Sequence, residues 1–266
     1  MLLENKNAVV YGAAGAVGGA IARAFAHEGA TVFLAGRTQG PLDDVAREIR
    51  QAGGRAHPAV VDALNEPAVD NHLASLIGQA GHLDISVNAI GVDHVQGVPL
   101  VELAVEDYAL PIQTYPITQF LTARAAARHM VDQGSGVILT MSTTAARVSL
   151  PSDGFGIACA GVEALSRQLA GELGPHGIRV VCLRPDAIPE SARRGSHTRS
   201  VWGRAAERAG MTLDELLDGS PGMSGALLQR SPTLREVADV ATVMASDRVT
   251  AMTGTVANVT CGAILD

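Results

Sequence analysis

The chain has 266 residues, of which 47% are hydrophobic and 18% charged, and its formal net charge is −7. This composition excludes a disordered or fibrous protein, because such chains lack the apolar residues that build a core. The negative charge argues against nucleic acid or an anionic membrane as a partner. The length fits one domain if strands and helices alternate throughout.

The cysteines and the first residues bear on the compartment. Cys159, Cys182 and Cys261 are sparse and lack the spacing of metal ligands, a pattern typical of a reducing cytoplasm and of a protein without a metal site. No apolar run approaches the ~20 residues that span a bilayer, and the N-terminus lacks the pattern of a secretory signal. We therefore expect a cytoplasmic protein that does not contact membranes.

Short apolar runs alternate with helical patterns along the chain. The predicted strands cover residues 8–11, 31–35, 59–61, 83–88, 137–141, 179–183 and 254–259. The predicted helices cover 17–27, 41–52, 66–80, 101–130 and 157–173, with prolines at 111 and 116 interrupting the fourth. This alternation predicts an α/β fold with one doubly wound, parallel, Rossmann-type sheet of about seven strands and helices on both faces.

Residues 189–231 break this rhythm. They are rich in Ser, Gly, Arg and Met, and one helical pattern occurs near residues 213–217. A long irregular insertion after a strand is typical of a mobile loop or a substrate lid. We expect this segment to be the lid of the single domain.

A glycine-rich turn lies between the first predicted strand and the first predicted helix. Gly12 can form the turn, Gly15 allows the backbone to approach a pyrophosphate, and Gly18 allows the helix to pack on the sheet. The helix N-terminus then offers N–H groups to the phosphates. In this context the turn predicts a dinucleotide site, with a purely structural turn as the alternative. The expected binding residues here are Gly12, Ala14, Gly15, Ala16, Val17 and Gly18.

The end of the second predicted strand indicates which dinucleotide binds. An NAD site would have an acidic residue there for the ribose 2′-hydroxyl, but this chain has Arg37. A guanidinium can bind a 2′-phosphate through two hydrogen bonds, so the sequence favours NADP(H). The alternative is a solvated arginine at a strand end.

Further motifs follow the later strands. They are Asp62, Asn88-Ala-Ile-Gly91, Gly136-Val-Ile-Leu-Thr-Met-Ser142, Ala160-Gly-Val-Glu163, Leu169-Ala-Gly-Glu-Leu173, Gly177 to Pro185, and Thr253-Gly254. Together with the glycine turn and Arg37, they resemble the short-chain dehydrogenase/reductase family over nearly the whole chain. The resemblance implies a Rossmann-type domain, often assembled into dimers or tetramers, with Asp62 near the adenine and Asn88 supporting the cofactor loop. It adds Ala63, Ala89, Ile90, Pro185 and Ile188 to the expected cofactor residues.

The catalytic set of that family is largely replaced in this chain. Its Tyr-x-x-x-Lys segment aligns with Phe155 to Cys159, its serine with Thr143 or Ser142, and its asparagine with Tyr115. Phenylalanine has no ionisable proton and a thiol cannot supply a fixed positive charge. Because general acid catalysis contributes about 10²–10⁴-fold, we expect ordinary carbonyl reduction to be badly impaired.

Other residues are candidates to replace the missing acid. Tyr115 is either an acid facing the cleft or a partly buried helix aromatic. His94 and Asp153 are either acids or surface loop residues, and Cys159 as a nucleophile is less favoured than Cys159 as a small buried thiol.

Two functions are consistent with these residues. The first is an NADP(H)-dependent oxidoreductase that transfers hydride to or from a small organic substrate, such as a conjugated alkene or a preformed iminium, that needs no protein acid. The alternative is a non-redox or inactive protein that binds or senses NADP on the same fold. In either case we expect a homo-oligomer, with helical residues 123–130 and 162–173 as candidate interface surfaces.

Overall fold

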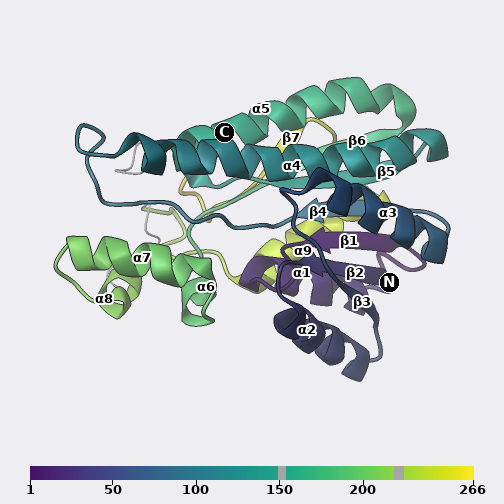
Figure 1. The fold of residues 1–266 in the computed structure, drawn as a ribbon, viewed down its shortest axis with the longest axis horizontal. Helices are drawn as coiled ribbons and strands as arrows, with labels where there is room; N and C mark the ends of the chain where they lie inside the picture. The colour runs from purple at the N-terminus through teal and green to yellow at the C-terminus, as the bar shows by residue number, and fades with distance from the viewer. Residues whose placement is uncertain (149–153, 219–224) are drawn as a thin grey trace.

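The computed structural model describes residues 1–148, 154–218 and 225–266. Within these residues seven parallel strands form one sheet in the order β3-β2-β1-β4-β5-β6-β7 (Figure 1). The strands are β1 (Asn7–Tyr11), β2 (Thr31–Gly36), β3 (Arg55–Val60), β4 (Ile85–Asn88), β5 (Gly136–Met141), β6 (Ile178–Pro185) and β7 (Thr255–Val259). The predicted doubly wound sheet is therefore confirmed. The strand order reverses between β1 and β4, and in such sheets ligands bind outside the carboxyl ends of the strands at this reversal.

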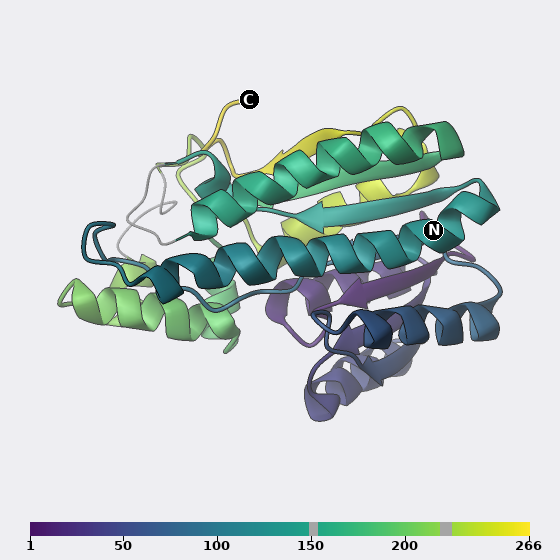
Figure 2. The ribbon, with the colours of Figure 1, turned by 45° about the horizontal axis from the view of Figure 1, so that its top comes forward.

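Helices cover both faces of the sheet. One face carries α1 (Ala16–His27), α2 (Gln39–Gln51) and α9 (Leu234–Ala245), and the other carries α3 (Glu66–Ala80), α4 (Val105–Gln133) and α5 (Phe155–Leu173). Figure 2 shows α4 and α5 lying side by side. Alternate residues of β1 enter the two cores, with Val10 on the α1 side and Val9 on the α4 side. Among the described residues there are also three short 3₁₀ helices: Thr144–Ala146, Gly174–His176 and Asp247–Val249.

Two predicted elements differ from the observed ones because of proline. β3 begins four residues earlier than predicted, at Arg55, and includes Pro58. A strand tolerates proline at the edge of a sheet, and β3 is an edge strand. α4 is continuous, although Pro111 and Pro116 were expected to interrupt it. Each proline removes one backbone hydrogen bond, but the packing of this long helix against β5 and α5 maintains it.

The insertion after β6 is more helical than the sequence predicted. Its described part contains α6 (Pro189–Arg193), α7 (His197–Arg208) and α8 (Leu213–Asp218). Ala192, Val201, Trp202 and Leu217 form a small apolar cluster between these helices, which explains why they are stable as helices. The three helices lie at one end of the molecule, beside the start of α4 (Figures 1 and 2).

Helix α9 was not predicted, although its start has a local signal. The Thr233 side chain accepts from the Glu236 backbone N–H, and the Glu236 side chain accepts from Thr233 in return, which is a capping box. Among the described residues no helix combines the length and the apolar character that crossing a membrane requires.

Candidate functional site

The glycine turn leaves no room for a side chain at position 12 or at position 18. Gly12 has a φ of +77°, and a Cβ there would lie 2.7 Å from the carbonyl oxygen of Ala89. A Cβ on Gly18 would lie 2.3 Å from the carbonyl oxygen of Gly12. Gly15 is the N-cap of α1, and no side chain caps this helix. The turn thus presents backbone N–H groups at a helix N-terminus, as phosphate binding requires. The remaining residues predicted for this turn are partly exposed: Ala14, Ala16 and Val17.

Arg37 and Asp62 lie at the ends of neighbouring strands. Arg37 directly follows β2, is exposed, and forms no hydrogen bond or ion pair with any described residue. Asp62 is exposed two residues after β3, and its Oδ1 accepts from Leu64 N at 3.0 Å. The adjacent Ala63 is buried. Because β2 and β3 are paired and parallel, both polar side chains are at the same edge of the sheet. An anion at this edge can be bound by Arg37 without breaking an existing contact.

The loop after β4 is held by Asn88. Its Nδ2 donates to Thr122 Oγ1 at 2.9 Å, and its Oδ1 accepts from Ile90 N at 3.1 Å. Gln119 Nε2 also donates to the same oxygen at 3.2 Å. These bonds fix Ala89 and Ile90 beside the glycine turn, where a Cβ on Gly12 would meet both. Asn88 therefore fixes the backbone of this loop.

Phe155 and Cys159 lie at the start of α5 and offer no ionised group. The Phe155 ring stacks on His94 with a centroid separation of 4.0 Å and an interplanar angle of 9°. Cys159 is fully buried, with its Sγ 3.6 Å from Thr143 Oγ1, and burial raises the pKa of the thiol to about 12. The thiol is therefore protonated near neutral pH, which disfavours it as a nucleophile.

Tyr115 is fully buried rather than partly buried, and its hydroxyl already forms a hydrogen bond within the protein. The hydroxyl donates to the carbonyl oxygen of Met141 at 2.6 Å, and burial raises its pKa well above the ordinary value. A phenol in this state holds α4 against the end of β5. Because this hydroxyl already donates a hydrogen bond to a backbone carbonyl, it is not available as an acid.

His94 is also buried, so the expectation of a surface loop residue was wrong. Its Nδ1 lies 3.1 Å from the carbonyl oxygen of Val92, and its Nε2 lies 2.9 Å from Gln96 Nε2. The ring therefore carries its proton on Nδ1 and accepts at Nε2. Burial lowers its pKa, so the imidazole is neutral near pH 7. Asp153, the third candidate acid, lies outside the described residues.

Of the two hydroxyls at the end of β5, only Thr143 reaches the surface. Ser142 is buried and donates to Glu163 Oε1 at 2.9 Å. Thr143 is partly exposed, and its Oγ1 accepts from Ala145 N at 3.1 Å. Thr143 can still donate a hydrogen bond to a bound oxygen.

On the next strand Pro185 ends β6, and the buried Ile188 is the N-cap of α6.

The insertion is attached to the loop after β4 through α7. Arg204 donates to Asp93 Oδ1 and to the carbonyl oxygen of His94, and Arg208 donates to the carbonyl oxygen of Gln96 at 2.8 Å. The His197 ring packs so closely on Gly91 that a Cβ there would lie 1.8 Å from its Cε1. Partial desolvation and the neighbouring His94 lower the pKa of His197 to about 4. This imidazole is also neutral at pH 7.

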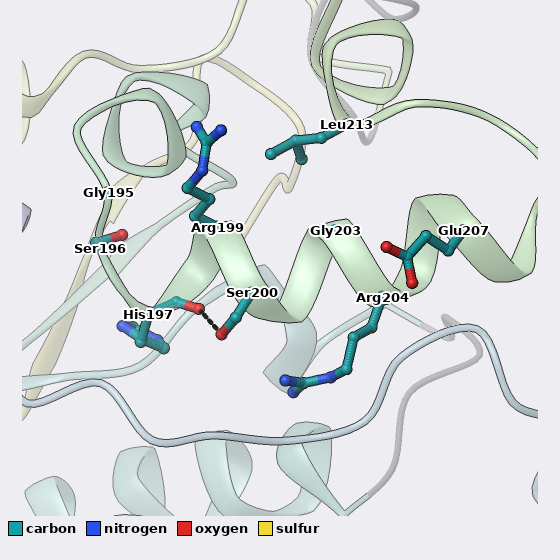
Figure 3. Close-up of a pocket in the computed structure, with 9 residues that line it drawn as sticks. All are labelled: Gly195, Ser196, His197, Arg199, Ser200, Gly203, Arg204, Glu207 and Leu213. Atoms are coloured by element: carbon teal, nitrogen blue, oxygen red, sulfur yellow. Dashed lines mark hydrogen bonds between the residues drawn. The ribbon is translucent and has the colours of Figure 1, made fainter.

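A groove of about 640 Å³ runs along α7 (Figure 3). Arg199 and Arg204 extend from opposite sides of the helix, and Ser200 donates to the carbonyl oxygen of His197. The lining residues are Gly195, Ser196, His197, Arg199, Ser200, Gly203, Arg204, Glu207 and Leu213. None of the predicted cofactor residues lines it, so this groove is separate from the glycine turn.

Sequence reasoning missed one set of residues at the end of the sheet. Glu163 and Arg184 are both buried and form an ion pair in which Arg184 Nε lies 2.7 Å from Glu163 Oε1. The available signal was Arg184 directly after the apolar residues 180–183 of β6, since a buried arginine requires a partner. The contact between His197 and Gly91 had no comparable signal.

Comparisons with known proteins agree with this architecture. A family profile described as enoyl-(acyl carrier protein) reductase matches residues 12–263. The chain is 30% identical over 262 residues to an uncharacterized oxidoreductase of Methylorubrum extorquens, covering 98% of each chain. It is 33% identical over 208 residues to cis-4-hydroxycyclohexanecarboxylate dehydrogenase of Sinomonas cyclohexanicum, covering 75% of this chain and 83% of that protein.

A solved structure is similar to this chain over almost its whole length. It is a short-chain type dehydrogenase/reductase from Mycobacterium marinum, with a TM-score of 0.79 and 28% identity, covering 99% of this chain and 97% of the other. The chain therefore belongs to the short-chain dehydrogenase/reductase family of oxidoreductases.

Proposed function

We propose that this chain binds NADP(H) and transfers hydride between it and a small organic substrate without a tyrosine acid. The observation that carries the proposal is Arg37, an arginine without a partner among the described residues at the end of β2, beside a turn in which only glycine fits at positions 12 and 18. Its guanidinium would bind the 2′-phosphate, and the N–H groups at the start of α1 would bind the pyrophosphate. Asp62 and Ala63 would lie near the adenine, as in the family. Ala89, Ile90, Pro185 and Ile188 would surround the ribose and nicotinamide.

The residues at the nicotinamide end restrict the substrate. When bound, the nicotinamide supplies or accepts the hydride. Thr143 would donate a hydrogen bond to a substrate oxygen, and Phe155 would offer only an apolar surface. Substrates whose reaction needs no protein proton donor, such as a conjugated alkene protonated by water after hydride addition, fit this arrangement. The name of the matching family profile, an enoyl reductase, supports an alkene. The helices α6 to α8 would close over such a substrate as a lid.

Deuteride transfer tests this proposal. NADPH deuterated at C4 is incubated with panels of enones, enoyl thioesters, iminium ions and ketones, and the products are analysed by mass spectrometry. We expect stereospecific transfer to at least one alkene or iminium. NADPH binding without transfer to any class would contradict the proposal and support the alternative of an inactive NADP-binding protein.

The substitution Phe155→Tyr then tests whether an acid is missing. We expect the transfer rate to change by less than about threefold, because a tyrosine acid needs a lowered pKa, and position 159 carries a neutral thiol instead of lysine. Phe155→Leu serves as the control for altered packing against His94. A rise of about 100-fold in the rate of ketone reduction with Phe155→Tyr would contradict this expectation. It would mean that the protein lacks only the tyrosine for the ordinary carbonyl reduction of the family.

We further propose a homo-oligomer that uses the outer surfaces of α4 and α5. The apolar residues of 123–130 and 162–173 are mostly packed inside the chain, whereas Ile117, Phe120 and Ile157 are exposed. An exposed apolar surface of this kind is typical of an interface. Light scattering should give a dimer or tetramer, and Phe120→Glu should reduce the mass towards that of one chain. A wild-type protein that is monomeric at micromolar concentration would contradict this expectation.

A further inference from the structure

A buried ion pair connects α5 to the end of β6. Arg184 Nε lies 2.7 Å from Glu163 Oε1, and Arg184 Nη2 lies 3.0 Å from Glu163 Oε2. The exposed fractions of the two residues are 1% and 5%. Among the ion pairs between described residues, this is the only one in which both side chains are less than a tenth exposed. The geometry is bidentate, which fixes the orientation of both groups.

Two further contacts extend this pair to other segments. Ser142, at the end of β5, donates to Glu163 Oε1 at 2.9 Å. Arg184 Nη1 lies 2.6 Å from Asp266 Oδ1, and Arg184 lowers the pKa of this carboxyl. The set therefore connects the ends of β5 and β6 with α5 and with residue 266. We call Ser142, Glu163 and Arg184 the buried clamp.

The buried clamp adjoins the segments assigned to the nicotinamide. Ser142 directly precedes Thr143, and Arg184 directly precedes Pro185. Glu163 lies one turn of α5 after Cys159, the position where the family has lysine. A second bond crosses between the same two segments, from Thr144 Oγ1 to Asp186 Oδ1 at 2.8 Å.

Stability alone does not account for a charged pair at this place. The desolvation of two buried charges offsets much of their attraction, and well-packed apolar residues of similar volume often stabilise a protein as well or better. A buried pair with fixed geometry does specify how the connected segments lie relative to each other. The clamp is thus better suited to fixing positions than to raising the free energy of unfolding.

We propose that Ser142, Glu163 and Arg184 act as positioning residues, which hold Thr143 and the segment 185–188 in the geometry that receives the nicotinamide end of the cofactor. The inference rests on the proposed NADP(H) function. In this chain position 159 carries no lysine, and the buried clamp would keep the ends of β5 and β6 aligned at the nicotinamide. The clamp does not touch the adenosine half, because Arg37 and the glycine turn lie at the ends of other strands.

The test compares two ligands that differ only at the nicotinamide end. Calorimetry measures binding of NADPH and of 2′-phospho-ADP-ribose, which lacks the nicotinamide, to wild type and to the double variant Glu163→Met/Arg184→Met. This variant removes both charges together, so no unpaired charge remains buried. We expect about tenfold weaker NADPH binding and unchanged binding of 2′-phospho-ADP-ribose, a selective loss that a general effect on stability would not produce.

A milder variant keeps the test informative if the double variant fails to fold. Ser142→Ala removes one hydrogen bond to Glu163, and we expect a selective loss of about threefold for NADPH. Ser166→Ala is the matched control, because Ser166 bonds Thr140 between the same two elements, further from the strand end.

Each outcome has a separate meaning. Equal binding of NADPH by wild type and by the folded variants would overturn the positioning role while leaving the proposed function intact. Equal weakening of both ligands would also overturn it, because the effect would then be on the whole fold. Binding of neither ligand by wild type would overturn the proposed function and the positioning role with it.

Discussion

Gly18→Ala is expected to weaken NADPH binding by at least about 100-fold. The added Cβ would lie 2.3 Å from the carbonyl oxygen of Gly12 and 2.7 Å from its carbon, and both are backbone atoms that cannot rotate away. Either α1 moves away from the sheet or the turn opens, and in both cases the N–H groups lose the geometry that binds a pyrophosphate. Calorimetric titration with NADPH measures the loss.

Gly78→Ala is the matched control, because this helical glycine in α3 is exposed and has nothing within 4 Å of an added Cβ. We expect it to bind NADPH as wild type does and to unfold at an equal or slightly higher temperature. Gly18→Ala must be shown by circular dichroism to remain folded. A folded Gly18→Ala protein with wild-type affinity would contradict the assignment of the turn.

Arg37→Ala is expected to weaken NADPH binding by about 10–100-fold, which is the loss of one charge-assisted phosphate contact of about 1.4–2.8 kcal/mol. The affinity for NADH should stay within about twofold of the wild-type value, because NADH has no 2′-phosphate that Arg37 could bind. The preference between the two cofactors should therefore disappear. Titration of both cofactors against wild type and variant measures this directly.

Arg47→Ala controls for the change in net charge. Arg47 is exposed on the neighbouring helix α2 and pairs with Asp44, so its removal alters the charge of the same region without touching the end of β2. We expect little change in the preference for NADPH. If Arg47→Ala and Arg37→Ala weakened NADPH binding equally, the phosphate would be attracted by the overall positive charge of this region and not by a specific contact with Arg37.

The parts of the fold that depend on local patterns were predictable from the sequence. Apolar runs and glycine positions are local, so the order of strands and helices and the turn at Gly12 followed from neighbouring residues. Helix α9 was not predicted, although the capping box formed by Thr233 and Glu236 is a local signal for its start. The extent of β3 depended on its place at the sheet edge, where Pro58 is tolerated, and that place becomes visible only when the strands are assembled.

The side-chain partners in the site were not predictable, because they join residues far apart in the chain. His94 stacks on Phe155, and the hydroxyl of Tyr115 donates to the carbonyl oxygen of Met141. Two candidate acids therefore have partners within the protein. The pairing of Glu163 with Arg184 likewise depends on packing α5 against β6. The family resemblance predicted which residues stand at the catalytic positions, but only the assembled structure indicates what those residues contact.

The most direct test of the account is a calorimetric titration of the wild-type protein with NADPH and with NADH under the same conditions. The account predicts that NADPH binds at least about tenfold more tightly, because only NADPH offers a phosphate to Arg37. Equal affinity for the two cofactors would contradict the role of Arg37. Binding of neither would contradict the NADP(H) site itself and would leave the glycine turn as a structural feature of the fold.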